Sequence, residues 1–119
     1  MYWMRRTAAA LAITAAALVT PGVAHAQATD DYQGCPSGYV CIYPNASWNN
    51  GVPEHRYYNY QAYDLTNEFG VHRIFNNQTG GATVQTCKGY GGSNCGDKMA
   101  PWTYRDEDLT PINSILLQS

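Results

Sequence analysis

The sequence predicts an all-β protein, and three observations support this expectation. No stretch after Cys35 keeps a helical spacing of apolar residues for a run of ten. Short runs rich in β-branched and aromatic residues alternate instead with clusters of Gly, Asn and Pro. Four cysteines in so short a chain point to disulfide staples. We therefore expect one small β domain stabilised in part by disulfides.

The first 26 residues have the pattern of a secretory signal peptide. Arg5 and Arg6 form a positive start, residues 8–20 are apolar, and residues 24–26 (AHA) are a cleavage site of the A-x-A type. The apolar run is too short to span a bilayer, and no second hydrophobic segment follows it. We expect cleavage after residue 26, secretion, and a mature protein that does not span a membrane.

The mature chain is expected to be a flexible N-terminus at residues 27–34 followed by one domain at residues 35–119. Without Arg5 and Arg6, five Lys and Arg residues face nine Asp and Glu residues, a net charge of −4. An acidic surface argues against nucleic acid and anionic membranes as partners. We expect the domain to be a monomer.

Six β-prone runs predict the strands of this domain, and they cover residues 39–43, 56–60, 71–75, 82–86, 102–104 and 113–117. The motif Y-x-x-x-D-L-T occurs at residues 60–66 and again, 44 residues later, at 104–110. We expect Leu65 and Leu109 to enter the core, with the adjacent Asp or Thr capping a short turn. Two such halves, 35–79 and 80–119, predict two Greek keys packed as a sandwich.

The cysteines Cys35, Cys41, Cys87 and Cys95 allow three pairings. We expect Cys35–Cys41 and Cys87–Cys95, because each pair is close in sequence and sits in a Gly-rich turn. Closing loops this short stabilises the fold by roughly 2–3 kcal/mol each. A zinc site is disfavoured by the spacings C-x5-C and C-x7-C and by export into an oxidising compartment.

The same residues carry a family resemblance. The stretch CPSGYVCIY at residues 35–43, W-x-x-G at 48–51 and Y-x-G at 90–92 resemble the βγ-crystallin Greek-key pattern. With its secretion signal and late Cys-bounded loop, the chain resembles the secreted actinobacterial metalloproteinase-inhibitor family (Streptomyces metalloproteinase inhibitor-like) over about residues 34–117. The resemblance implies a βγ-crystallin-like sandwich of two Greek keys, two disulfides, and inhibition of thermolysin-like zinc proteases with a reactive bond at Cys87–Lys88.

The expected reactive loop is Cys87, Lys88, Gly89 and Tyr90, presented to an extracellular protease in substrate-like fashion. A stapled loop reduces the ordering penalty of binding by roughly 0.5–1.5 kcal/mol per immobilised side chain. Thermolysin-like enzymes take a large apolar residue after the scissile bond, and an unpaired ammonium in an apolar pocket is strongly disfavoured. Lys88 therefore also suggests a trypsin-like target with an acidic pocket, and the alternative is a braced surface loop with Lys88 in water.

Two other binding functions compete with inhibition. Tyr57, Tyr58, Tyr60 and Tyr63 crowd one segment and could stack on the sugars of a cell wall. The domain could instead be a non-inhibitory, calcium-stabilised structural module of the βγ-crystallin type.

We expect no enzyme activity, metal centre or cofactor, with the one exception that weak calcium binding is conceivable near Asp106, Glu107 and Asp108. His55 and His72 are isolated in the sequence, and neither H-E-x-x-H nor G-x-S-x-G occurs.

Overall fold

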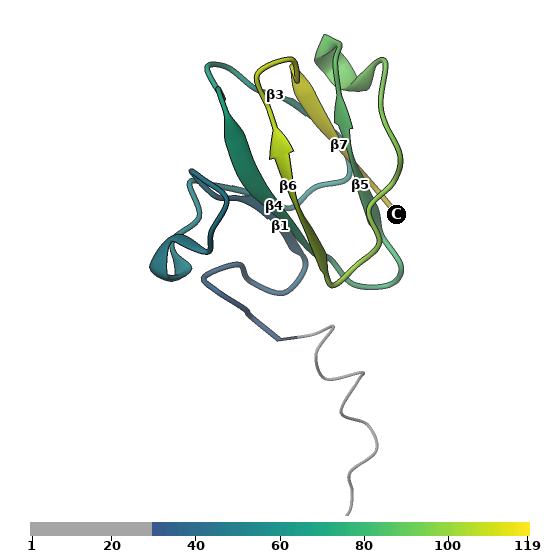
Figure 1. The fold of residues 1–119 in the computed structure, drawn as a ribbon. Coiled ribbons are helices and arrows are strands. Elements are labelled where there is room, and N and C mark those ends of the chain that lie inside the picture. Colours follow the sequence, from purple (N-terminus) through teal and green to yellow (C-terminus); the bar gives the residue numbers. More distant parts are fainter. Residues whose placement is uncertain (1–29) are drawn as a thin grey trace, which may run out of the picture.

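The computed structural model describes residues 30–119, so the expected signal peptide at residues 1–26 lies outside the described residues. The described chain contains short strands and two single-turn 3-10 helices (Figure 1). The strands are β1 (Tyr39–Ile42), β2 (His55–Tyr57), β3 (Ala62–Asp64), β4 (Val71–Asn77), β5 (Thr83–Cys87), β6 (Thr103–Asp108) and β7 (Ser114–Gln118). The 3-10 turns are η2 (Asn49–Gly51) and η3 (Tyr90–Gly92).

The strands form two antiparallel sheets, which confirms the all-β prediction. One sheet has four strands in the order β2-β1-β4-β6, and the other has three in the order β3-β7-β5. Strand β3 belongs to the first half of the chain but pairs with β7, whereas β6 belongs to the second half but pairs with β4. Each sheet is therefore completed by a strand from the other half, which ties the two halves into one body (Figure 1).

Two strands differ from the sequence-based expectation. Strand β3 was not predicted, and β6 runs through Asp108 although its last residues are acidic. The acidic run is accommodated because β6 lies beside β4, where Arg73 is directly opposite Asp106. Opposite charges on paired strands stabilise a sheet, so context outweighs the low β-propensity of Asp and Glu.

The main core lies between the sheets and is aliphatic; its members include Val40, Ile42, Leu65, Ile74, Val84, Met99, Leu109, Ile112, Ile115 and Leu117. Leu65 and Leu109 of the repeated motif are both buried, as expected. Their backbone N–H groups bond across to the other half, Leu65 to the Asn113 oxygen and Leu109 to the Gly70 oxygen. The capping expectation is met at Asp108, whose Oδ1 accepts a 3.0 Å bond from the Thr110 N–H.

A second, aromatic cluster lies beneath the N-terminal end of the described chain. It buries Cys35, Cys41, Tyr43 and Phe75, and the disulfide Cys35–Cys41 forms within it as expected. Residues 27–34 were expected to be flexible, but Tyr32 exchanges two backbone hydrogen bonds with Cys35, of 3.0 and 2.8 Å. The described part of this segment is thus held against the domain.

Asn76 joins the two halves through a buried polar network. Its Nδ2 donates to the backbone oxygens of Ala82 (3.1 Å) and Met99 (3.0 Å). Its Oδ1 accepts bonds of 3.0 Å from both the backbone and the side-chain nitrogen of Gln78. All four hydrogen-bonding positions of the Asn76 amide are used, so its burial carries no unsatisfied group.

The second disulfide, Cys87–Cys95, is also formed as expected, and no described cysteine is free. Two disulfides indicate a protein of an oxidising, non-cytoplasmic compartment. No helix within residues 30–119 has both the length and the apolar character needed to cross a membrane.

Candidate functional site

The Cys87–Cys95 loop begins where β5 ends and is anchored to β7. Cys87 is fully buried and lies opposite Ser114 in the β5–β7 register. The disulfide to Cys95 closes the loop, and η3 forms its tip. The loop therefore leaves the sheet from a fixed residue and returns to the same point.

The backbone at the base of this loop is held by the chain segment before and at the start of β7. The Cys87 oxygen accepts from the Asn113 N–H (2.9 Å), and the Lys88 oxygen accepts from Asn113 Nδ2 (2.8 Å). Lys88 N–H donates to the Asn94 oxygen at 2.9 Å. Asn113 thus fixes two successive carbonyl groups of the expected reactive segment.

Ser114 fixes the next part of the loop. Its Oγ donates to the Gly89 oxygen (2.6 Å) and accepts from the Gly92 N–H (3.0 Å). Gly89 N–H donates to the Ser93 oxygen at 3.0 Å, and a Cβ on Gly89 would collide with Ser93 Oγ. A side chain at position 89 would therefore force Ser93 to shift, which favours glycine there.

Two side chains of the expected reactive loop project from this rigid backbone. Lys88 is exposed and takes part in no ion pair with the described residues. Tyr90 is 60% exposed at the start of η3. Lys88 borders an open hollow of about 230 Å³ that is also lined by Glu107 and Ile112. A basic and an aromatic group are therefore offered to solvent from a fixed frame.

The peptide bond Cys87–Lys88 itself is poorly placed for attack. A protease must polarise the scissile carbonyl, but the Cys87 oxygen is already bonded to the Asn113 N–H and Cys87 is fully buried. Cleavage there requires local opening of the contact with Asn113. The side chains of Lys88 and Tyr90 need no such opening to contact a partner.

The acidic run of β6 is divided among different partners. Asp106 binds the Arg73 guanidinium (2.8 Å), and Glu107 lies 3.3 Å from Arg105 Nε. Asp108 bonds to Thr110, and these hydrogen bonds lower the pKa of its carboxyl group. Successive side chains of a strand point to opposite faces. The three carboxylates conceived as a weak calcium site therefore do not converge.

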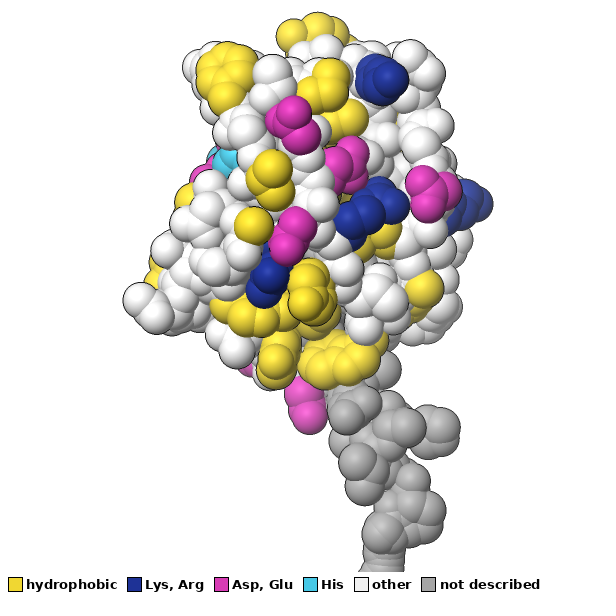
Figure 2. All heavy atoms as spheres, in the orientation of Figure 1, with side chains coloured by type: hydrophobic (Ala, Val, Ile, Leu, Met, Phe, Trp, Pro, Cys, Tyr) yellow, Lys and Arg dark blue, Asp and Glu magenta, His cyan; other side chains and the backbone are white. Residues whose placement is uncertain are grey.

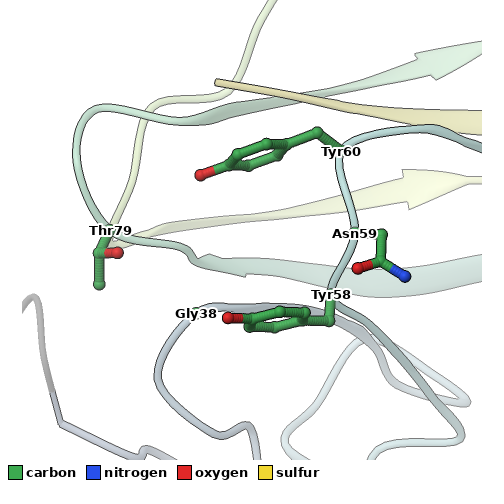
Figure 3. A pocket seen from close by; sticks show the side chains of 5 residues that line it. All are labelled: Gly38, Tyr58, Asn59, Tyr60 and Thr79. Atoms are coloured by element: carbon green, nitrogen blue, oxygen red, sulfur yellow. The ribbon is translucent and has the colours of Figure 1, made fainter.

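The tyrosine-rich segment splits into an inner and an outer pair. Tyr57 and Tyr63 pack against each other, with ring centroids 4.4 Å apart, and against the main core. Burial raises the pKa of Tyr57 to about 12. Tyr58 and Tyr60 are 58% and 57% exposed and border a hollow of about 140 Å³. Figure 3 shows their rings projecting to the same side from the Asn59 bend, toward Thr79.

A larger aromatic surface lies elsewhere and was not expected from the sequence. A hollow of about 190 Å³ is lined by Tyr32, Trp48, Phe75, Trp102 and Tyr104. The Arg73 guanidinium lies over the rings of Trp48 (4.7 Å) and Tyr104 (4.2 Å) while it binds Asp106. A patch of hydrophobic side chains with basic and acidic neighbours is visible in the lower half of Figure 2. Its residues come from distant segments, so Trp48 and Trp102 were the only sign of it in the sequence.

His55 and His72 are isolated in the sequence but adjacent in space. His55 Nε2 lies 2.9 Å from Glu68 Oε2, and His72 Nδ1 lies 3.6 Å from Glu68 Oε1. Glu54 completes the group, with Oε2 at 3.4 Å from His55 Nε2. The cluster has no signature in the sequence, because β3 and the turn after it separate Glu54 and His55 from Glu68 and His72.

Searches for similar proteins add no further assignment: no family model, curated protein or solved structure matches this chain.

Proposed function

We propose that this protein is a secreted proteinase inhibitor that engages an extracellular protease, metallo- or trypsin-like, through the loop Cys87–Tyr90. The observation that carries the proposal is the exposure of Lys88 and Tyr90 on a loop whose backbone is fixed by Asn113, Ser114 and a disulfide. A loop that is already ordered loses little entropy when it binds. Tyrosine is among the residues that most often dominate the binding energy of an interface, and the Lys88 ammonium can pair with a carboxylate in an acidic pocket.

The loop is expected to bind largely intact. The buried Cys87 carbonyl disfavours attack at Cys87–Lys88, and Lys88 is available to enter an acidic pocket. If the bond is cut during a transient opening, the disulfide and the Asn113 contacts hold both new ends in place. Religation then competes with the release of product. We therefore propose that the protease converts the intact loop to the cut form only slowly.

The fold underlying this proposal is inferred to be a pair of Greek keys of the βγ-crystallin-like type. In a Greek key the fourth strand returns to lie beside the first. Strand β4 pairs with β1 in the first half, and β7 pairs with β5 in the second. Met99 bridges Val84 at the edge of the smaller sheet, where a second strand of the second key would lie.

The direct test is inhibition by the purified secreted protein of one trypsin-like and one thermolysin-like protease. We expect inhibition of at least one of them at micromolar concentration or below. Mass spectrometry under non-reducing and reducing conditions should show mostly uncut chain in the complex. If protein that is shown to be folded and oxidised inhibits neither enzyme, the proposal is refuted.

A second candidate function, binding of cell-wall or other polysaccharide, is favoured by the aromatic hollow rather than by the Tyr58–Tyr60 face. Flat rings with polar edges suit the apolar faces and hydroxyl rims of sugars. Trp48 and Trp102 in the hollow allow the test by fluorescence. Trp102→Ala should abolish retention on insoluble cell wall, whereas Tyr60→Ala should not. Absence of retention of the unmodified protein would exclude this candidate.

A further inference from the structure

Three segments bring two carboxylates and two imidazoles together where β2 and β4 begin. Glu54 and His55 stand at the start of β2, Glu68 lies in the turn before β4, and His72 is the second residue of β4. The candidate ligand atoms of Glu54, His55 and Glu68 all lie within 4.8 Å of one another. This group lies apart from the Cys87–Cys95 loop and plays no part in the proposed inhibition.

The ion pair between Glu68 and His55 leaves one carboxylate oxygen of Glu68 without a partner. Its side chain is only 10% exposed, and its Oε2 lies 2.9 Å from His55 Nε2. Its Oε1 is buried and has no hydrogen-bond partner. A buried carboxylate oxygen that lacks a partner is destabilising. A bound cation would supply the missing partner.

His72 supports Glu68 but does not compete for the cation. Its ring is 5% exposed, and both of its nitrogens face carbonyl oxygens, Nδ1 toward Tyr43 (2.8 Å) and Nε2 toward Phe69 (3.1 Å). Both ring nitrogens are therefore occupied by backbone oxygens, which leaves neither of them free to bind a cation.

We propose that Glu54, His55 and Glu68 form a binding site for a divalent transition-metal ion, with Zn²⁺ as its best match. One imidazole nitrogen and two carboxylate oxygens are a donor set that Zn²⁺ accepts, with ligand distances of about 2.0–2.2 Å. Two ligands of a tetrahedral ion at such distances are separated by roughly 3.4 Å. The observed separations from His55 Nε2 are 2.9 and 3.4 Å, so small side-chain shifts suffice.

The donor set also selects against calcium. Ca²⁺ takes six to eight oxygen ligands, whereas this cluster offers two carboxylates and a nitrogen. Three protein ligands leave a fourth position of a tetrahedral ion for water or for a ligand from a partner. His55 and Glu54 are partly exposed, with side chains 39% and 29% accessible, so an ion can reach the site from solvent.

The test is calorimetric titration of the chelator-treated, oxidised protein with ZnCl₂, with thermal unfolding measured in parallel. We expect one Zn²⁺ per chain and a melting temperature that rises with zinc and falls back with a chelator. His55→Ala and Glu68→Gln should each weaken binding about tenfold or more, whereas Asp97→Asn, which changes an exposed carboxylate elsewhere, should not.

Circular dichroism of each variant establishes that it is folded, and His55→Ala provides the decisive comparison if Glu68→Gln does not fold, because His55 is partly exposed. The proposal is overturned if a 100-fold molar excess of Zn²⁺ produces neither heat nor a thermal shift. That result would mean that the dissociation constant lies far above the micromolar range. The proposal is equally overturned if His55→Ala binds as tightly as the unmodified protein, or if Ca²⁺ binds there in preference to Zn²⁺.

Discussion

Ser114→Ala is the substitution that tests most simply how the loop is held. Ser114 is fully buried, and its hydroxyl makes one bond as donor to the Gly89 oxygen and one as acceptor from the Gly92 N–H. The change removes a single oxygen atom and leaves the β7 backbone and its pairing with β5 unaltered. Its effect therefore reports the two side-chain contacts with the loop and little else.

Each of these bonds contributes about 0.5–1.5 kcal/mol, so Ser114→Ala should lower the free energy of unfolding by about 1–3 kcal/mol. Urea unfolding under non-reducing conditions measures this loss as a lower midpoint with an unchanged slope. Hydrogen exchange at the Gly92 amide should accelerate, because that amide loses its acceptor.

Ser93→Ala is the matched control, since the same chemical change in the same loop removes one exposed bond to the Tyr90 oxygen. It should change the unfolding free energy by less than about 0.5 kcal/mol. Equal effects of the two substitutions, or a Gly92 amide that exchanges as before in Ser114→Ala, would refute the view that Ser114 fixes the loop.

Three other substitutions or conditions have defined outcomes. Asn76→Ala should destabilise the fold by about 3–5 kcal/mol in urea unfolding, because it removes four buried hydrogen bonds; a loss below about 1 kcal/mol would contradict the network. Gly89→Ala should lower the free energy of unfolding by about 1–3 kcal/mol, since its Cβ meets Ser93, and Ser93→Gly in the same chain should restore part of the loss. Burial raises the pKa of Tyr43 and of Tyr57 from 10.0 to about 12. Deprotonation thus favours the unfolded chain, and stability that is complete below pH 10 should fall as the pH rises toward 12. An unfolding midpoint that stays constant between pH 10 and pH 12 would contradict the burial of these two hydroxyl groups.

Features that depend on local sequence were predictable. The disulfide pairs followed from cysteines six and eight positions apart in Gly-rich turns, and both formed. The buried leucines followed from a repeated motif, because Leu65 and Leu109 occupy equivalent turns in the two halves. The disulfide inference needed only near neighbours along the chain, and the leucine inference needed only the match between two short motifs.

Features built from distant segments were not predictable. Strand β3 is three residues long and exists because β7 pairs with it from the other half. The Glu54, His55 and Glu68 cluster and the aromatic hollow likewise arise from strand pairing that no local pattern encodes. The loop was found from the sequence, but the burial of Cys87 was not, because it depends on Asn113 and Ser114 of the last strand and the turn before it.

The most direct test of the proposed function compares two lysines. Lys88 and Lys98 are both exposed, and only Lys88 lies in the Cys87–Tyr90 loop. If the loop is the inhibitory surface, Lys88→Ala should weaken inhibition of the target protease by roughly 30-fold or more, the loss typical of an interface hot spot of at least 2 kcal/mol. Lys98→Ala should leave the inhibition constant unchanged. Equal inhibition constants for Lys88→Ala, Lys98→Ala and the unmodified protein would contradict the assignment of the loop.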